Sequence, residues 1–148
     1  MVTQLVYVSA AVRPLLRADL AQILRASRRH NPAVGVTGVL VYADRAILQV
    51  LEGPPEAVDA TFARAAADPR HHGILVLYRA IAGERTFPDW TMGLYRAADL
   101  SDDGRDHAES MFDLAGGGAG DRGPIPPSRV RRFLASFAAS ARPSRPFD

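Results

Sequence analysis

The chain of 148 residues contains no cysteine. Disulfide bridges, thiolate metal sites and cysteine nucleophiles are therefore excluded. It also contains no lysine, so all 18 basic residues are arginine. Arginine keeps its proton throughout the working pH range, which explains how a sequence pI of about 9.5 coexists with a net charge of only +2. The high pI is a weak argument for nucleic-acid binding, and arginines mixed with acids along the chain indicate a solvated surface.

Long apolar runs and common catalytic motifs are absent as well. No run approaches the roughly 20 apolar residues that a membrane span needs. The N-terminus lacks the pattern of a secretory signal, so we expect a cytoplasmic protein that binds no membrane. There is no HExxH zinc helix and no GxSxG nucleophile elbow, and the glycine run at 116–120 follows no predicted strand. With 47% hydrophobic and 23% charged residues, the sequence predicts one soluble globular domain with a short extension.

The hydrophobic periodicities predict strands and helices in the order βαββαββ, followed by a helical tail. The predicted strands span about residues 4–9, 38–42, 46–52, 74–80 and 90–95, and the predicted helices span about 15–27 and 56–67. In the first helix Leu16, Leu20, Ile23, Leu24 and Ser27 share one stripe, and Asn31-Pro32 is expected to end it.

This order is that of a ferredoxin-like α+β fold with one additional strand, a mixed sheet with both helices on one face. The strands are apolar on both faces, so the other face needs a cover. The tail offers one, because Val130, Phe133, Leu134 and Phe137 form a helical stripe. We therefore expect a domain at 1–97 and a C-terminal helical extension at 98–148, with a flexible break at 116–120 and frayed last residues from 141.

Gln49 is the most unusual residue of the predicted sheet. It lies in the middle of the apolar segment AILQVLEG (46–53), where an unpaired buried amide would cost roughly 1–3 kcal/mol. Tyr7 is a second hydroxylated residue in an apolar strand, LVYVS (5–9). If the two strands are neighbours, the phenol and the amide meet inside the core.

Further polar residues cluster at the ends of the two predicted helices: Ser27, His30 and Asn31 after the first, and Asp68, Arg70 and His71 after the second. Both ends can point at one cleft with Tyr7 and Gln49 as its floor, which is the usual form of a small-molecule site. Taken singly, each of these residues except Gln49 is more often an ordinary turn or surface residue, and Trp90 and Met92 are most often simple core.

Five blocks occur in order along the chain: LVYVS, SRRHNPAVGVTGVL, ILQVLEG, DPRHHG and FPDWTMG. Together they resemble the BLUF family of blue-light receptors that use FAD, over about residues 2–97. Two departures are small: Val36 stands where isoleucine is common, and Arg45-Ala46-Ile47 replaces the usual glycine and phenylalanine.

The resemblance implies a ferredoxin-like sheet with the flavin between the two helices, and it implies roles for individual residues. Tyr7 would donate an electron and a proton to the excited flavin, and Gln49 would rearrange its hydrogen bonds. Trp90 and Met92 would relay the signal. The remaining matched residues would surround the flavin: Ser27, His30, Asn31 (at the pyrimidine edge), Asp68, Arg70 and His71.

The residue types also support a flavin site independently of the resemblance to the family. A planar ring with a polar edge needs an apolar slot, which Ile23, Ile47 and Ala65 are expected to line, with Asn31 and Arg70 as edge donors. FAD is the expected cofactor, with FMN and riboflavin as alternatives. The protein is then expected to be a sensor without enzymatic activity or nucleic-acid binding, signalling through an unidentified partner protein or its own oligomer.

Two other functions remain open from the residues alone. A ferredoxin-like RNA-binding domain would need exposed aromatic residues on its central strands for base stacking, whereas the third strand offers Ile47, Gln49 and Leu51. A small hydrolase could use Arg13 and Asn31, but no nucleophile–base pair supports it.

Overall fold

The computed structural model describes residues 1–43, 45–88, 92–96 and 126–138, with side chains to 135. Its elements are β1 (Val2–Ala11), α1 (Arg17–Val34), β2 (Thr37–Ala43), β3 (Ala46–Gly53), α2 (Pro55–Ala66), β4 (His71–Ala82), β5 (Gly93–Arg96) and α4 (Pro127–Ala138). The order of strands across the sheet is β4-β1-β3-β2-β5. Neighbours are antiparallel except β2 and β5, which are parallel. The predicted mixed α+β sheet is confirmed.

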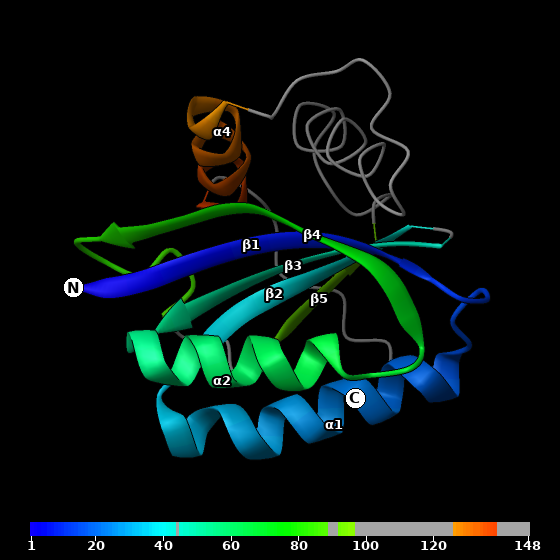
Figure 1. Cartoon of the computed structure of the whole chain (residues 1–148). Helices are drawn as coiled ribbons and strands as arrows, with labels where there is room; N and C mark the ends of the chain where they lie inside the picture. The colour runs from blue at the N-terminus through cyan, green and yellow to red at the C-terminus, as the bar shows by residue number, and fades with distance from the viewer. Residues whose placement is uncertain (44, 89–91, 97–125, 139–148) are drawn as a thin grey trace.

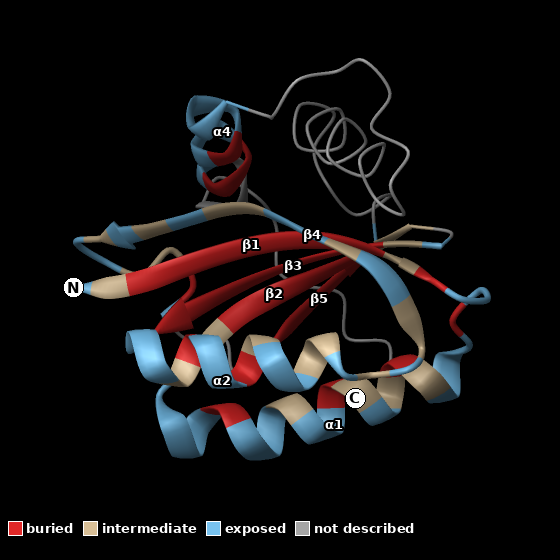
Figure 2. Cartoon of the chain, in the orientation of Figure 1, coloured by how far each residue is buried: buried red, intermediate tan, exposed pale blue. Residues whose placement is uncertain are grey.

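The sheet is covered on both faces (Figure 1), with α1 and α2 on one face and α4 on the other. Because side chains alternate along a strand, β1 and β3 contribute to two separate cores. Leu5 and Leu51 pack with α1 and α2, whereas Val6 and Val50 pack with α4. Figure 2 shows the central strands as the most continuously buried part of the chain. β4 forms one edge and is only partly buried.

The tail covers the second face as the sequence predicts. Val130, Phe133 and Leu134 of α4 are buried against the sheet residues of that core. Phe137, the fourth residue of the predicted stripe, lies beyond the described side chains. The boundary at residues 97 and 98, the glycine run at 116–120 and the chain end at 141–148 also lie outside the described residues. None of the helices described has the length and apolar character to span a membrane.

The prediction that Asn31-Pro32 ends the first helix is wrong, since α1 continues to Val34. Proline lacks an N–H and so removes one helical hydrogen bond, to the carbonyl four residues before it, but only two more residues of α1 follow it. Gly35 then closes the helix in a left-handed conformation (φ 73°), and the N–H of Val36 reaches the Asn31 carbonyl at 2.9 Å. Asn31 is therefore a helical residue held in the last turn and is 1% exposed.

Three other boundaries differ from the prediction. Leu16, expected on the buried stripe, is the residue before α1 and is 59% exposed, while its N–H donates to Asp19 Oδ2 at 2.8 Å. β4 spans His71–Ala82 and is longer than predicted. β5 begins at Gly93, so Met92 precedes this strand instead of lying in it. Trp90 lies outside the described residues.

Candidate functional site

Tyr7 and Gln49 form the centre of the site. The strands β1 and β3 pair so that these two residues lie directly opposite each other, and the Tyr7 hydroxyl donates a hydrogen bond to Gln49 Oε1. Both side chains are buried, at 2% and 5% exposure. Burial, assisted by the nearby Asp68 carboxylate, raises the pKa of Tyr7 above its ordinary value. At neutral pH the phenol therefore keeps its proton and donates it to Gln49 Oε1.

The other end of the Gln49 amide faces Met92. Gln49 Nε2 lies 3.7 Å from Met92 Sδ, and Met92 is 2% exposed. Sulfur is a weak acceptor, so this end of the amide is held less firmly than the end that Tyr7 contacts. The Gln49 side chain thus joins a strong donor on β1 to a weak acceptor in the residue just before β5.

A cavity of about 290 Å³ opens beside this pair, close to the lower end of the range of roughly 300–1,000 Å³ for small-molecule sites. It is lined from β1, β2, β3, α1, α2 and the start of β4. The structure brings together at this cavity Tyr7 and all ten residues predicted to surround a cofactor, namely Ile23, Ser27, His30, Asn31, Ile47, Gln49, Ala65, Asp68, Arg70 and His71.

Several lining residues were not anticipated: Leu15, Ala26, Arg29, Leu40, Thr61 and Arg64. Two of them follow from helical spacing on α2, because Thr61 lies four residues before Ala65 and Arg64 lies three residues after Thr61. Thr61 is 8% exposed, and its Oγ1 is the one buried side-chain N or O atom in the described part of the chain without a hydrogen-bond partner. An unpaired buried hydroxyl beside a cavity indicates a place for a ligand atom.

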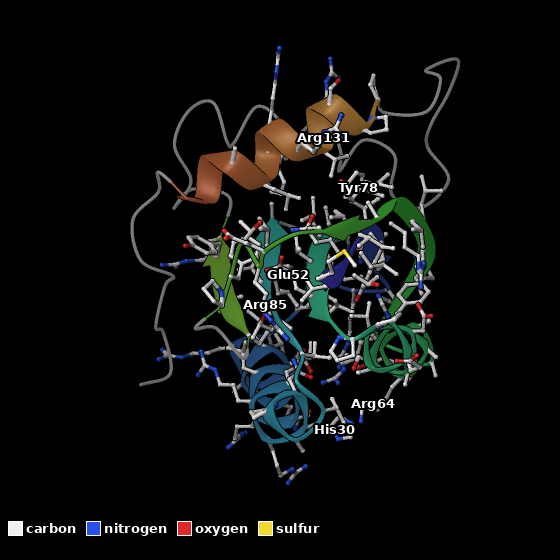
Figure 3. The ribbon with its side chains drawn as sticks, turned by 90° about the vertical axis from the view of Figure 1, so that its left-hand side faces the viewer. His30, Glu52, Arg64, Tyr78, Arg85 and Arg131 are labelled. Atoms are coloured by element: carbon white, nitrogen blue, oxygen red, sulfur yellow. The ribbon has the colours of Figure 1, made fainter. Side chains whose placement is uncertain are left out.

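The outer part of the cavity is basic. Arg29 and His30 come from α1 and Arg64 comes from α2, and all three side chains are exposed. Figure 3 shows His30 and Arg64 on the same side of the molecule, near the two helices. No carboxylate of the described residues lies within 4.0 Å of the charged nitrogens of Arg29 or Arg64. This cationic end suits an anionic group on a ligand.

Asp68 and Arg70 form a forked ion pair at the cavity wall. Arg70 Nε donates to Asp68 Oδ1 at 2.9 Å and Nη2 donates to Oδ2 at 2.6 Å, while the Arg70 N–H reaches Oδ1 at 3.0 Å. These hydrogen bonds hold the pKa of Asp68 below its ordinary value and raise the pKa of Arg70. Arg70 Nη1 also reaches Gln22 Oε1 at 3.3 Å, so the pair ties the turn before β4 to α1.

Asp68→Asn is expected to lower the free energy of unfolding at pH 7 by roughly 1 kcal/mol, because an amide accepts fewer charge-assisted bonds than a carboxylate. Asp68 has a lowered folded-state pKa, so its contribution is present above the ordinary value of 3.8 and is lost as the pH falls through the folded-state value. Urea unfolding between pH 7 and pH 3 should therefore show a weaker acid dependence in this variant.

Asp59→Asn is the matched control. Asp59 pairs with Arg79 at 3.1 Å, but both side chains are about half exposed, so we expect a loss of at most about 0.5 kcal/mol. Equal effects of the two substitutions would show that the Asp68–Arg70 fork is no stronger than a surface pair.

His71 is held by two hydrogen bonds. Its Nδ1 lies 2.7 Å from the Ser9 hydroxyl, and its Nε2 contacts the Ala65 carbonyl. A carbonyl can only accept, so Nε2 carries a proton and donates it. His71 therefore connects β1 with the last turn of α2, beside Tyr7, whose ring centroid lies 6.4 Å from that of the imidazole.

The two other functions considered from the sequence lack a site in the described residues. Arg13 is exposed, does not line the cavity and approaches Asp19 at 4.0 Å, so it forms no hydrolase pair with Asn31. The central strands β1 and β3 are buried between helices and present no exposed aromatic platform. No group of three or more potential metal ligands is present among the residues described.

The sequence is similar to those of known blue-light sensors. The family described as "BLUF: Sensors of blue-light using FAD" matches residues 2–93. Among curated proteins, the photoactivated adenylate cyclase subunit beta of Euglena longa is 37% identical over 91 residues, which is 61% of this chain and 11% of that protein. The Euglena gracilis protein of the same name is 38% identical over the same shares. This chain thus spans about a tenth of the length of these relatives.

Solved structures extend the likeness to most of the chain. The dark-state structure of BlrB, a BLUF protein, matches with a TM-score of 0.73 and 33% identity, covering 93% of this chain and 96% of that one. The photo-activated state of BlsA matches with a TM-score of 0.78 and 26% identity, covering 98% and 100%.

Proposed function

The chain belongs to the BLUF family of blue-light sensors that use FAD, and we propose that it is a photoreceptor that binds a flavin noncovalently in the cavity beside Tyr7 and Gln49. The observation that carries this proposal is the buried hydrogen bond from the Tyr7 hydroxyl to Gln49 Oε1 at the cavity wall. A family of sensors also agrees with the expectation that this chain is not an enzyme; cyclase activity belongs to the longer relatives.

The lining of the cavity fits an isoalloxazine ring. Ile23, Ile47 and Ala65 supply apolar surface for its faces, and Asn31 lies in the last turn of α1 where its amide can meet a polar ring edge. Thr61 supplies a hydroxyl that has no protein partner. Apolar walls with a few convergent polar groups are the usual composition of a cofactor site.

The basic outer end of the cavity favours a phosphorylated flavin. Arg29, His30 and Arg64 can pair with phosphate, which riboflavin lacks. FAD and FMN both carry a phosphate on the ribityl chain, so both suit this end. We propose FAD, the cofactor in the family's description.

A bound flavin supplies absorption of blue light and, when excited, a strong electron acceptor. Tyr7 would be the electron donor to this acceptor, and its hydroxyl proton, held on the hydrogen bond to Gln49 Oε1, would leave with the electron and return with it to restore the phenol. The Gln49 amide can then turn and exchange its carbonyl oxygen for its NH2 group. This change breaks the contact of Nε2 with Met92 Sδ, so the amide and Met92 form a two-state element of the kind that a switch requires.

Purification and denaturation test the cofactor. We expect a yellow protein that releases all of its flavin on denaturation, because the proposed flavin is held noncovalently and no cysteine is present to form a thioether with it. The emptied protein should bind FAD and FMN more tightly than riboflavin, by about tenfold for one lost charge-assisted contact. Isothermal titration with the three flavins measures this difference. A colourless protein that takes up none of them would contradict the proposal.

For the output we propose that light changes the packing of α4, the described part of a C-terminal extension at 98–148, or its contact with a partner protein or a second copy. Met92 packs in the core on the cavity side, while the next strand, β5, sends Tyr95 into the core beneath α4. β5 therefore contacts both layers. A shift of a few kcal/mol suffices to change populations.

Hydrogen exchange of residues 127–138 in darkness and under blue light measures this output. Faster exchange in the light, by severalfold, is expected because Val130, Phe133 and Leu134 would lose part of their buried contacts. Identical protection in a protein whose flavin spectrum still responds to light would show that α4 is a static cover.

A further inference from the structure

Glu52 is a fully buried carboxylate that the proposed photochemistry does not use. It is 0% exposed and lies on β3, three residues after Gln49. By the alternation of the strand it shares the face of Leu48 and Val50, which is the α4 face and not the cavity face. A buried carboxylate on that face requires hydrogen-bond donors.

Three N–H groups supply these donors. Oε2 accepts from Gln4 Nε2 at 2.7 Å and from the Thr86 N–H at 2.8 Å, and Oε1 accepts from the Phe87 N–H at 2.7 Å. Two of the donors are consecutive backbone groups of the segment that follows β4. The Glu52 carboxylate therefore holds the backbone of Thr86 and Phe87 in place, in addition to pairing with the neighbouring Gln4 side chain.

The connection from β4 to β5 has to cross the sheet, because these strands form its opposite edges. Its described part, residues 83–88, is tied to each of the three strands between. Gln4 of β1 donates to Thr86 Oγ1 at 3.1 Å, and Glu52 of β3 holds the backbone of Thr86 and Phe87. Arg85 reaches Thr37 Oγ1 of β2 at 2.9 Å.

Arg85, which is half-buried, adds a second anchor beside Glu52, and Figure 3 shows the two labelled residues next to each other. Its guanidinium donates to the Glu52 carbonyl at 3.2 Å and to the Gly35 carbonyl at 2.8 Å. The crossing segment is thus fixed at both the carboxylate and the backbone of one β3 residue.

The anchored segment connects the core beneath α4 with the contact between Met92 and Gln49. Phe87 is 3% exposed and belongs to the core that contains Phe133 of α4. Met92, five residues further along the chain, meets Gln49 on the other face of the sheet. Glu52 and Gln49 of β3 therefore contact the same connection. Glu52 contacts its first part at Thr86 and Phe87. Gln49 contacts its last residue, Met92.

We propose that Glu52 is a positioning residue of the light switch, whose carboxylate anchors the β4–β5 crossing and thereby sets Met92 against Gln49 and Phe87 beneath α4. This inference rests on the proposed photoreceptor function. A carboxylate is needed because all three contacts are N–H donors and a carboxylate only accepts. A glutamine at this position would turn its own NH2 group toward at least one of those donors.

Glu52→Gln tests the proposal in the full chain, with Glu84→Gln as the matched control, because Glu84 is an exposed carboxylate of the same segment. We expect Glu52→Gln to keep its flavin and the light-induced spectral shift, since Tyr7 and Gln49 are unchanged. Its return to the dark spectrum should be slower by at least about fivefold, because a loosened crossing weakens the contact with Met92 to which the Gln49 amide has to return, and one lost charged hydrogen bond is large enough for this factor. Glu84→Gln should recover at the wild-type rate.

A double-mutant cycle separates positioning from general destabilisation. Met92→Leu keeps the volume but removes the sulfur that Gln49 contacts. If Glu52 acts by placing Met92, Glu52→Gln should slow recovery in the wild-type background and have little further effect in Met92→Leu. Recovery within twofold of wild type in Glu52→Gln, or equal slowing in both backgrounds, would overturn the proposal.

Gln4→Leu covers the case in which Glu52→Gln does not fold, because it removes one donor to the carboxylate and leaves both backbone donors. It should slow recovery in the same Met92-dependent way, and a wild-type rate would count against the inference. A wild-type protein that binds no flavin would overturn the proposed function together with this inference. A normal wild-type photocycle that Gln4→Leu and Glu52→Gln leave unaltered would overturn this inference alone.

Discussion

Tyr7→Phe is expected to abolish the light response while the protein still binds its flavin. Phenylalanine keeps the ring that packs edge-on against Phe62 at 5.2 Å, so the cavity wall is preserved. It removes the hydroxyl that donates to Gln49 Oε1, and a benzene ring gives up an electron far less readily than a phenol. Absorption spectra before and after blue light should show the ordinary flavin bands and no light-induced shift.

The same variant should lose roughly 1 kcal/mol of stability toward urea, because Gln49 Oε1 loses a buried donor. Tyr42→Phe is the matched control. The Tyr42 hydroxyl accepts the Leu15 N–H at 3.0 Å, but Tyr42 does not line the cavity. We expect Tyr42→Phe to retain the full light-induced shift, and a shift of wild-type size in Tyr7→Phe would assign Tyr7 a structural role only.

Much of this site could be predicted from the sequence because its central residues violate a strong local pattern. Gln49 interrupts an apolar strand and Tyr7 interrupts another, and period-two alternation then gives the face of each. What alternation cannot supply is the register, and the structure adds that these residues lie directly opposite each other. The residues at the helix ends could be proposed together because α1 and α2 cover the same face of the sheet.

Other features depend on tertiary contacts that no local pattern contains. Pro32 predicts a helix end, yet α1 continues to Val34, and the left-handed Gly35 with the hydrogen bond from Val36 to the Asn31 carbonyl closes it there. Glu52 reads as an ordinary residue at a strand end, since its donors come from residues 4, 86 and 87. A donor set spread over 83 positions of sequence is visible only when the chain is folded.

The distribution of polar groups across β3 connects these points. Gln49 faces the cavity with one firm and one weak partner, whereas Glu52 faces α4 with three N–H partners. One strand thus carries a group that can change its hydrogen bonds and a group that cannot change without breaking several. If the Gln49 amide turns while Glu52 holds the crossing in place, the change in hydrogen bonding moves Met92 and not the whole sheet.

Gln49→Leu is the second substitution with an all-or-none expected effect. Leucine approximates the volume of glutamine but has no donor or acceptor, so the Tyr7 hydroxyl is left buried without its partner at a cost of roughly 1–3 kcal/mol. We expect the flavin to remain bound, because Ile23, Asn31, Ile47 and the other lining residues are unchanged. The light-induced spectral shift should disappear, since no amide remains to exchange its oxygen for its NH2 group.

Gln22→Leu provides the same chemical change on the exposed face of α1, where Gln22 accepts a hydrogen bond from Arg70 at 3.3 Å, and it should respond to light as the wild type does. Infrared difference spectra add a direct measurement, because the wild-type protein should show a light-induced change in a glutamine carbonyl band that Gln49→Leu lacks. A persistent spectral shift in Gln49→Leu would mean that Tyr7 signals without the amide. In that case the weak contact between Gln49 and Met92 would be packing alone, and the route from the cavity to β5 would have to start at another residue.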